Sequence, residues 1–473
     1  MSNRNETPVL LISLLITVAL VGALGAWLWP RLQLGGSDPS TDSAQSVNTQ
    51  TETATETSDS RLSQGEQILV ADASPLKQQG VEAIAAGNYD QAVSLLESAL
   101  AENRNDPEAL IYLNNARIAE QQAYTIAVAA PVETALDPAL EILRGVAQAQ
   151  TEINQAGGLD GVPLRVVIAD DGNSPAEAEA IANQLVAAAD VLAVVGHFSS
   201  NITLATAPIY TEGQLPLISP TSTSVEISGV SDYVFRTTPS DRFAATTLAR
   251  YMLNQLSQQT AAVFFNSESD YSTSLKNEFT TAVFSDGGQI AAELDLAAPN
   301  FNAAEAVQQL KSQGVETLML AANTSTLDQA IAVIEANGGD LAMLGGDSLY
   351  NPEVLSVGAA ADDLVVAIPW HILADPEADF AQDSRRLWGG DVSWRTAMAY
   401  DAVMAIAAAL ESTPVTNRQN LQATLTSATF AADGAASQVK FLPSGDRNQA
   451  AQLVTVEPGS RSGRGYDFVP VTP

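Results

Sequence analysis

The sequence predicts an α/β protein with two lobes, each of which is built on a doubly wound parallel sheet. A transmembrane helix and a short α-helical module are expected to precede this two-lobed domain. Three observations lead to this expectation. From Tyr124 onward, short runs rich in Val, Ile and Ala alternate with amphipathic stretches of about 12 to 20 residues. The alternation restarts after Arg236, which calls for a second sheet. Upstream of Tyr124 stand a helical periodicity and a long uncharged apolar run.

The N-terminal residues are expected to anchor the chain in a membrane. Val9–Trp29 is a run of 21 residues without a charge, enough at about 1.5 Å per residue to cross a hydrocarbon core of about 30 Å. Arg4 precedes the run and polar, acidic residues follow it, which places residues 1–8 in the cytoplasm and the remainder outside. The competing interpretation is a signal peptide cleaved near Ala23–Gly25, but its apolar core is usually only about 7–15 residues long.

A linker and a helical module are expected next. Residues 30–75 are mainly Ser, Thr, Gln, Asp and Glu, which predicts a flexible acidic linker. Residues 76–122 show apolar positions at three- and four-residue steps, and this module resembles a tetratricopeptide repeat. Because such repeats need about three copies to bury a continuous core, the alternatives are a spacer or cap on the next domain and an adaptor-binding groove. The resemblance is carried by Gly80, Gly87, Asn88, Tyr89, Ala92, Leu96, Ala99, Leu100 and Pro107.

Residues 123–473 are expected to form the two-lobed domain. Its elements follow from the change between strand-like and helix-like periodicity. In the first lobe the predicted strands are Thr125–Ala129, Leu164–Ala169, Val191–Val195 and Leu215–Ile218, with helices at Leu136–Gln155 and Pro175–Ala188. In the second lobe the predicted strands are Ala261–Phe265, Ile290–Leu294, Thr317–Ala321 and Met343–Leu344, with helices at Phe243–Leu256, Thr273–Phe284, Ala304–Gln313 and Leu327–Asn337.

The composition excludes several classes of partner and chemistry. Fifty-five acidic residues against 21 basic ones give a net charge of −34, which repels nucleic acid. There is no cysteine and there are only two histidines, His197 and His371, so no metal site and no cofactor are expected. No nucleophile elbow, phosphate-binding loop or dinucleotide fingerprint occurs, so the chain is not expected to be an enzyme.

Two hydroxyl-rich loops follow neighbouring strands of the first predicted sheet. Gly196–Thr203 comes directly after one strand, and Ser219–Ser224 comes after the next. In open α/β sheets, ligands bind beyond the carboxyl ends of the strands. Ser and Asn at a helix start leave backbone N–H groups pointing outward, which suits a carboxylate.

Six short motifs in order resemble the leucine/isoleucine/valine-type periplasmic binding proteins of ABC importers, which have the type I periplasmic-binding fold. The resemblance covers essentially all of residues 123–473. The motifs are Ile153–Gly161, Ala169–Pro175, Val195–His197, Pro216–Pro220, Phe235–Thr237 and Trp394–Ala402.

The resemblance implies a set of ligand-binding residues. Ser200 and Thr223 match the positions that hold a ligand carboxylate, and the carbonyl of Thr221 matches one that takes an ammonium proton. Asp347, in Gly345–Gly346–Asp347, matches the acidic partner of the ammonium. Tyr271 matches the aromatic ring that covers the ligand from the second lobe.

This sequence departs from the family pattern in ways that make the predicted pocket more polar. The loop Ala130–Ala135 lacks the usual glycine and aromatic residue, and Asn323 stands with Thr324 where another covering aromatic is expected. A polar or small amino acid, or a related amide, is therefore as consistent with the sequence as leucine. Trp370 follows a predicted strand near a lobe crossover, where it either lines the cleft or fills the hinge.

The function implied by the resemblance is that of an extracytoplasmic solute-binding protein of an ABC importer. It would bind an amino acid or related amide by hinge closure and deliver it to an ABC permease in the membrane. Crossovers are expected near Thr237–Asp241, Ala367–Trp370 and Val439–Leu442. The alternative is a ligand-sensing ectodomain that acts through a partner signalling protein. In both cases the binding domain lies in the periplasm or extracytoplasmic space, held by a single N-terminal helix.

Overall fold

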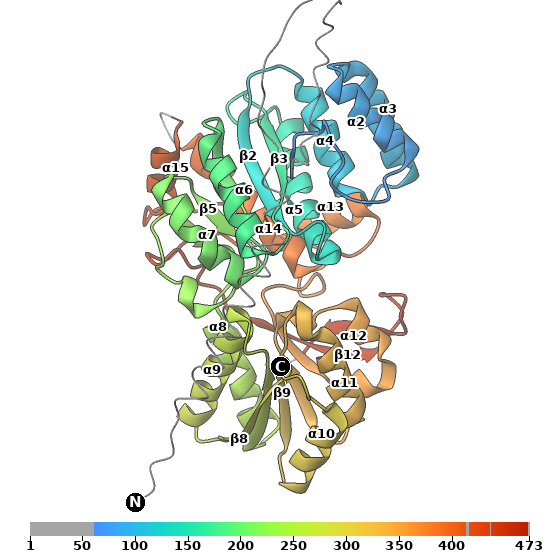
Figure 1. Ribbon diagram of the computed structural model, residues 1–473, viewed down its shortest axis with the longest axis vertical. Coiled ribbons are helices and arrows are strands. Elements are labelled where there is room, and N and C mark those ends of the chain that lie inside the picture. The colour runs from blue at the N-terminus through green and yellow to red at the C-terminus, as the bar shows by residue number, and fades with distance from the viewer. Residues whose placement is uncertain (1–60, 413–415, 436, 472–473) are drawn as a thin grey trace, which may run out of the picture. The chain divides into compact units, whose positions relative to one another are not determined.

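The computed structural model describes residues 61–412, 416–435 and 437–471, all within the unit Asp59–Pro473 (Figure 1). The expected cytoplasmic residues 1–8, the expected anchor 9–29 and most of the expected linker lie outside the described residues. In the part of the chain that the structure describes, no helix is both long and apolar enough to cross a membrane.

The first lobe is built on a six-stranded sheet with the order β1-β3-β2-β4-β5-β6. Its strands are parallel except β1, which pairs antiparallel with β3. Alternate residues of β2 face opposite ways: Ile126 joins the core that holds α5 and α14, whereas Ala127 packs with α6 and α7. The strands are β1 (Leu62–Ser63), β2 (Tyr124–Ala130), β3 (Leu164–Asp170), β4 (Val191–Val195), β5 (Leu217–Ser219) and β6 (Val234–Arg236). The helices are α5 (Leu136–Gln155), α6 (Pro175–Ala187), α7 (Ser200–Glu212), α13 (Asp379–Trp388), α14 (Trp394–Glu411) and α15 (Arg418–Leu425).

The second lobe has a seven-stranded sheet with the order β13-β12-β11-β10-β9-β7-β8. Helices α8 and α9 cover one face, and α10 and α11 share a core with the other. The strands are β7 (Thr260–Phe265), β8 (Gln289–Asp295), β9 (Thr317–Ala321), β10 (Ala342–Gly345), β11 (Val365–Ile368), β12 (Gln452–Pro458) and β13 (Tyr466–Pro470). The helices are α8 (Asp241–Arg250), α9 (Asp270–Ser285), α10 (Ala303–Ser312), α11 (Leu327–Asn337) and α12 (Pro352–Ser356), and a π-turn over Tyr251–Gln255 extends α8.

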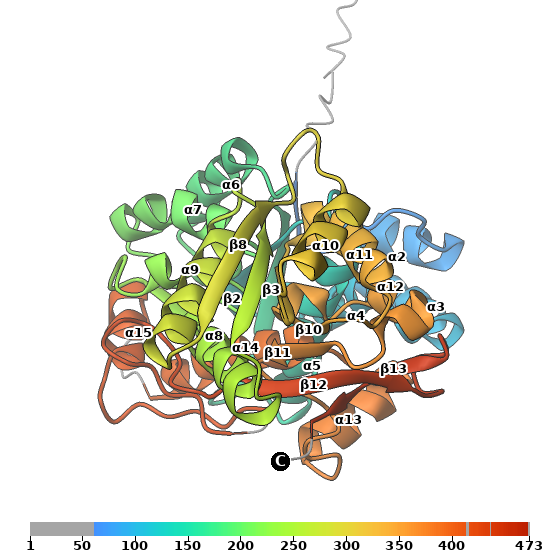
Figure 2. The ribbon, with the colours of Figure 1, turned by 90° about the horizontal axis from the view of Figure 1, so that it is seen from below.

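The sheets differ from the all-parallel expectation at their edges. Strand β12 runs antiparallel to its neighbour β11, and the edge strand β13 runs antiparallel to β12 (Figure 2). They come from the end of the chain, where residues 452–470 return to the second lobe after α14 and α15 have packed on the first. A strand that joins by such a long return is not bound to the parallel βαβ direction.

The expected linker 30–75 ends earlier than the sequence indicates. Arg61 forms ion pairs with Asp170 at 2.8 Å, Glu133 at 2.9 Å and Glu177 at 3.1 Å. Leu62 and Ser63 then form β1 against the edge of β3. In an acidic chain, one arginine that meets three carboxylates can hold a polar segment that composition alone predicts to be flexible.

The helical module consists of α2 (Pro75–Ala85), α3 (Tyr89–Glu102) and α4 (Pro107–Ile118), and it packs on the first lobe. Helix α4 starts at the capping residue Asp106, and all its residues except Arg117 are buried. Asn114 donates to Thr151 of α5 at 2.8 Å. The side-chain amide of Asn115 accepts the N–H of Val166 and donates to its carbonyl. It thereby satisfies backbone groups on the part of the β3 edge that β1 does not reach.

The chain crosses between the lobes three times. The first two crossovers follow β6 and β11, close to the expected positions. The third does not lie near Val439–Leu442, because Gly445 still accepts a hydrogen bond from the Arg236 N–H of the first lobe at 3.0 Å. It follows Arg447, just before β12.

Helices α5 and α14 cross at a glycine. A Cβ on Gly145 would stand 2.2 Å from the carbonyl oxygen of Thr396 and 2.7 Å from the backbone nitrogen of Tyr400. The two backbones therefore approach as closely as they do only because this residue has no side chain.

We expect Gly145→Ala to lower the free energy of unfolding by about 1–3 kcal/mol, because overpacking outweighs the gain in helix propensity of about 1 kcal/mol. Urea denaturation measures the change. Gly390→Ala is the matched control, since its Cβ would meet nothing within 4 Å. Equal stability of Gly145→Ala and the wild type would contradict this account of the crossing.

Candidate functional site

A cavity of about 370 Å³ lies between the lobes, at the carboxyl ends of strands from both sheets. The segments after β3, β4 and β5 and the start of α14 supply the wall from the first lobe, and the segments after β7, β9 and β10 supply the wall from the second. Most of its lining side chains are polar. They are Asn173, Pro175, Phe198, Ser199, Ser200, Asn201, Ile202, Thr221, Asn266, Glu268, Ser269, Tyr271, Asn323, Thr324, Ser325, Asp347, Ser348, Trp394 and Arg395.

The first-lobe wall presents the N-terminus of α7. Its N-cap residue, Ser199, makes no side-chain capping bond and instead donates to Asn173 at 2.7 Å. Ser200 is buried at the start of the helix and accepts the N–H of Ser224 at 3.2 Å. Uncapped N–H groups and the helix dipole together favour a negatively charged group at this wall.

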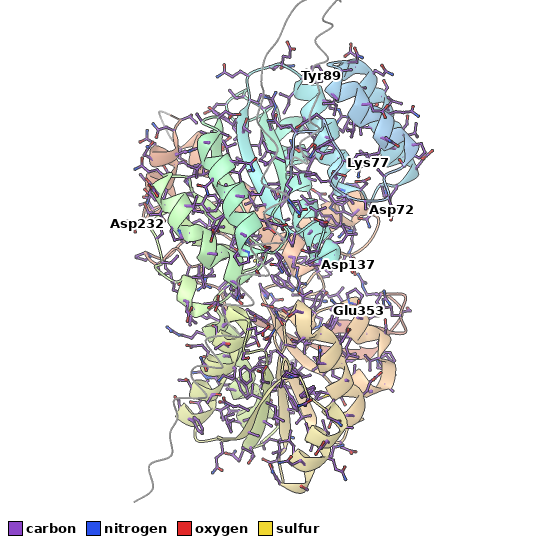
Figure 3. The ribbon with its side chains drawn as sticks, in the orientation of Figure 1. Asp72, Lys77, Tyr89, Asp137, Asp232 and Glu353 are labelled. Carbon is purple, nitrogen blue, oxygen red and sulfur yellow. The ribbon has the colours of Figure 1, made fainter. Side chains whose placement is uncertain are left out.

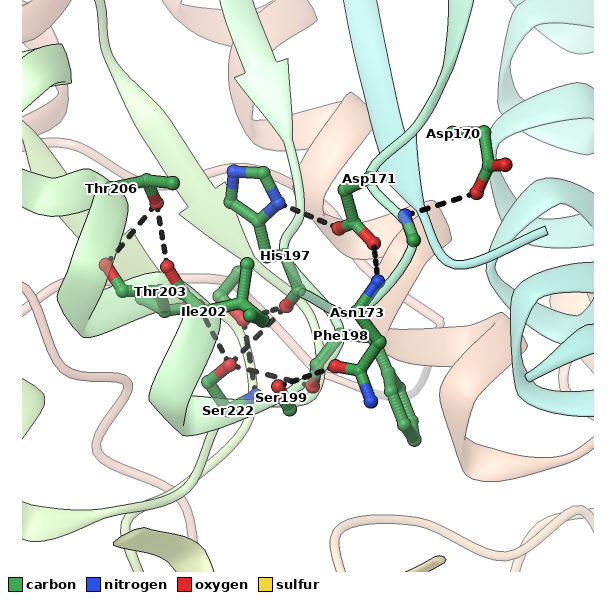
Figure 4. A network of polar contacts seen from close by, with 12 residues as sticks. Asp170, Asp171, Asn173, His197, Phe198, Ser199, Ile202, Thr203, Thr206 and Ser222 are labelled. Carbon is green, nitrogen blue, oxygen red and sulfur yellow. Dashed lines mark hydrogen bonds and ion pairs between the residues drawn. The ribbon is translucent and has the colours of Figure 1, made fainter. Parts of the chain in front are cut away.

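A buried polar network holds the α7 loop in place (Figure 4). His197 lies between Asp171, at 2.7 Å from Nδ1, and Tyr210, at 3.0 Å from Nε2. The carbonyl oxygen of His197 accepts hydrogen bonds from Ser219 at 2.9 Å and Ser222 at 3.2 Å. These contacts lie behind the cavity wall, so they fix Phe198 and the residues after it without facing the cavity themselves.

The second-lobe wall is centred on Asp347, which follows β10 in a single 3₁₀ turn. Burial raises its pKa to about 6, although the positive charge of Arg395 acts in the opposite direction. Tyr271 lies beside it, with its hydroxyl 3.5 Å from the N–H of Ser348. A Cβ on Gly346 would stand 2.3 Å from that hydroxyl, so only a glycine leaves room for the Tyr271 side chain in this position.

Arg395, in the first turn of α14, also lines the cavity, and the sequence analysis did not single it out. Only 8% of the residue is exposed, and its guanidinium lies over the ring of Trp394 at 4.5 Å. The sequence feature that could have pointed to Arg395 is its positive charge, two residues after the N-cap Ser393, at the start of a mostly apolar helix.

Five of the seven residues expected in the ligand site line this cavity: Ser200, Thr221, Tyr271, Asn323 and Asp347. Thr223 does not reach the wall but is buried behind it, beside the buried carboxylate of Asp241. Trp370 lies elsewhere. It is 2% exposed and packs edge-on against Phe380 at 5.5 Å, so its large ring fills the core near the crossover and does not face the cleft.

The lobes already touch beside the cavity, through the ion pair of Asp391 with Arg461 and through contacts of α7 and α9. The side chain of Asn201, on α7, accepts the N–H of Asp270 at 3.0 Å and donates to the carbonyl of Glu268 at 3.3 Å. Ser274 of α9 accepts the N–H of Val225 at 3.0 Å. These contacts join helix termini across the cleft and are few enough to break and re-form as the lobes move.

The crossover segments are tied to one another. Arg236 pairs with Asp446 at 2.7 Å, and Arg447 pairs with Asp401 and donates to the carbonyl of Thr237. Gln449 donates to the carbonyl of Pro369 at 2.9 Å, which links the third crossover to the second. The three crossover segments that connect the lobes are thus joined to one another by hydrogen bonds.

Two other cavities are present in the described part of the chain. One of about 580 Å³ adjoins the site and shares Arg395, Ser348 and Thr324 with it (Figure 3 labels Asp137 and Glu353 on its two sides). One of about 610 Å³ lies between α3, α5 and α13, away from the strand ends. Among the described residues no group of three or more His, Asp or Glu side chains is placed to hold a metal ion.

Comparison with known proteins identifies the fold. A sequence model of the periplasmic binding protein family matches residues 123–462. The chain belongs to this family. The family is one of solute-binding proteins, so the chain binds a solute and is not an enzyme. The match begins at residue 123 and therefore does not support the tetratricopeptide resemblance of residues 76–122.

Individual family members are similar over most of the two-lobed domain. The leucine-, isoleucine-, valine-, threonine- and alanine-binding protein of Pseudomonas aeruginosa is 26% identical over 311 residues, which cover 64% of this chain and 82% of that protein. The leucine-specific-binding protein of Salmonella typhimurium is 26% identical over 279 residues, covering 56% and 72%. The crystal structure of an ABC transporter substrate-binding protein from Desulfitobacterium hafniense in complex with Leu has a TM-score of 0.64 at 24% identity, covering 74% of this chain and 100% of that one.

Asp171 and His197 are expected to contribute to stability as a pair. Either Asp171→Ala or His197→Ala leaves a buried polar partner unsatisfied, so each should lower the free energy of unfolding by about 1–3 kcal/mol. The loss of unfolding free energy in the double variant should be smaller than the sum of the losses in the two single variants, by about 0.5 kcal/mol or more. Urea denaturation tests this, with the exposed Asp232→Ala as control. Strict additivity would show that the two side chains do not act together.

Proposed function

We propose that this chain is the extracytoplasmic binding subunit of an ABC importer and that it holds an amino acid or a related amide between its lobes. One observation carries the proposal. An uncapped helix N-terminus on the first lobe and the buried carboxylate of Asp347 on the second face the same cavity. Such a pair of walls is complementary to the carboxylate and the ammonium group of one small zwitterion.

In the proposed complex, the ligand carboxylate lies at the start of α7. Ser200 and the backbone N–H groups of the first helical turn donate to it, and the hydroxyl of Thr223, which lies behind the wall, completes the set after a small shift. The ammonium group lies against Asp347, and the carbonyl of Thr221 accepts one of its protons. Tyr271 covers the ligand from the second lobe.

The proposed mechanism is closure about the three crossovers. A ligand that meets only one lobe satisfies one of its two charges, whereas the closed arrangement satisfies both and excludes water from them. The ligand therefore stabilises the closed state by the interactions that it makes only there. The permease would then receive the closed, loaded form, from a binding domain held at the membrane by residues 9–29.

The side-chain end of the proposed site is polar. Asn266 donates to Asn323 at 3.0 Å and to Ser325 at 3.2 Å. Amide and hydroxyl groups therefore form the part of the wall where the family pattern has an aromatic residue. The relatives named above bind leucine and other small amino acids according to their names. A polar ligand of similar size fits this wall better than leucine does.

Calorimetric titration of the full-length chain with the twenty amino acids and small amides tests the proposed function. At least one amino acid should bind with a dissociation constant of about 1 μM or lower. Asp347→Ala should weaken that binding at least about 100-fold, since the ammonium loses a buried charged partner. If none of the amino acids and amides binds, or if the affinity is unchanged in the variant, the proposed site is refuted.

The affinity should also depend on pH through Asp347. Because burial raises its pKa to about 6 in the ligand-free protein, the ionised form that an ammonium needs is fully present above about pH 7. The affinity should fall about tenfold for each pH unit below 6. Asp347→Asn cannot titrate, so its weaker binding should not change between pH 5 and pH 7. A pH dependence that persists in this variant would assign the titration to another group, such as Asp241, whose pKa burial raises to about 7.

A further inference from the structure

Arg395 differs from other buried arginines in the described part of the chain. Arg236 is paired with Asp446 and Arg447 with Asp401, so each has a carboxylate partner. Arg395 is 8% exposed, yet among the described residues no carboxylate lies within ion-pair distance of it. Its Nε has no hydrogen-bond partner, and its Nη1 makes only a long contact, 3.4 Å, with the carbonyl of Tyr350. A buried guanidinium with an unused edge is costly to keep unless something binds it.

The position of this side chain is fixed by its neighbours. Trp394 stacks against the plane of the guanidinium, and the start of α14 is held to α5 through Glu141, which accepts from Ser393 and Thr396. Arg395 forms part of the wall of the 370 Å³ cavity, at its boundary with the adjoining cavity of about 580 Å³, and its unpartnered Nε lies just beneath that wall. A guanidinium edge with two parallel N–H groups matches the two oxygens of a carboxylate.

The charges of the cavity indicate which ligand would use this edge. Without a ligand, the negative charge of Asp347 acts on Arg395 across the cavity and offsets part of its positive charge. Once a ligand ammonium engages Asp347, that compensation is reduced, and Arg395 keeps only the more distant attraction of Glu141, with which it forms no ion pair. The ligand α-carboxylate proposed at the start of α7 has its donors there already. A neutral ligand side chain leaves the guanidinium without an ion-pair partner, whereas an acidic side chain supplies one, so that both buried charges of the site, Asp347 and Arg395, are paired.

We propose that Arg395 is a specificity-determining residue that binds the side-chain carboxylate of an acidic amino acid, L-glutamate or L-aspartate, through its guanidinium. This inference rests on the proposed function, because it takes the ammonium and the α-carboxylate to bind at Asp347 and α7. It adds a third point of attachment at the side-chain end, where the first lobe contributes the positive charge.

Calorimetry with L-glutamate, L-glutamine and L-leucine on the full-length chain tests this inference. L-glutamine has nearly the shape of L-glutamate without the charge, so the wild type should bind L-glutamate about 100-fold more tightly than L-glutamine and more tightly still than L-leucine. If L-glutamine or L-leucine binds as tightly as L-glutamate, the inference is wrong while the proposed function stands. If only an amide binds, the inference is likewise wrong, and if neither an amino acid nor an amide binds, the proposed function fails with it.

Substitution of Arg395 separates a side-chain role from an α-carboxylate role. Arg395→Gln should weaken L-glutamate binding about 100-fold and change L-glutamine binding by less than about threefold. Arg395→Lys, which keeps the charge without the planar edge, should give an intermediate loss. An equal loss for all three ligands would overturn the inference, because Arg395 would then hold the α-carboxylate. Arg250→Gln, which removes an exposed guanidinium, is the control and should change neither affinity. If Arg395→Gln does not fold, as judged by its thermal transition, the ligand ranking of the wild type and Arg395→Lys still decide.

Discussion

The structure depends on two opposite charges that are buried in one cavity. The two charged groups belong to different lobes and form no ion pair with each other. Asp347 is held by the turn after β10, and Arg395 is held by the start of α14 and by Trp394. Each would be more stable with a partner, and neither can reach the other without a movement of the lobes or an intervening group. A small molecule with charges at both ends resolves both costs at once. The rest of the domain positions the two groups and allows the lobes to move.

The fold separates the parts that are rigid from the part that moves. Each lobe has helices on both faces of its sheet, and Gly145 lets α5 and α14 pack backbone to backbone behind the first-lobe wall. The buried Asp171–His197–Tyr210 network fixes the loop before α7. Between the lobes there are three crossover segments and polar contacts that include those of Asn201, Ser274 and Arg395 and the ion pair of Asp391 with Arg461, and the lobes can move where such contacts break and re-form.

The fold could be predicted from local periodicity, and much of the candidate site from the hydroxyl-rich loops after two strands together with the resemblance to a known family. Strand and helix periodicity located the two sheets, and the loops after the strands contain Ser200, Thr221 and Asp347, all of which line the cavity. The failures concern contacts between distant segments. Trp370 follows a strand as a site residue would, but packs on Phe380; Arg61 meets carboxylates more than 70 positions away; and Arg395 joins the cavity from a helix near the end of the chain. No local pattern records these contacts.

The movement of the lobes on ligand binding is the central claim, and a distance measured across the cleft tests it most directly. The chain has no cysteine, so Asp137→Cys and Glu353→Cys place two spin labels uniquely, on exposed positions that lie on the two lobes beside the cleft (Figure 3). Pulsed electron paramagnetic resonance should give a shorter and narrower distance distribution when the amino acid that binds is added at saturation. An identical distribution with and without the bound ligand would contradict closure as the mechanism.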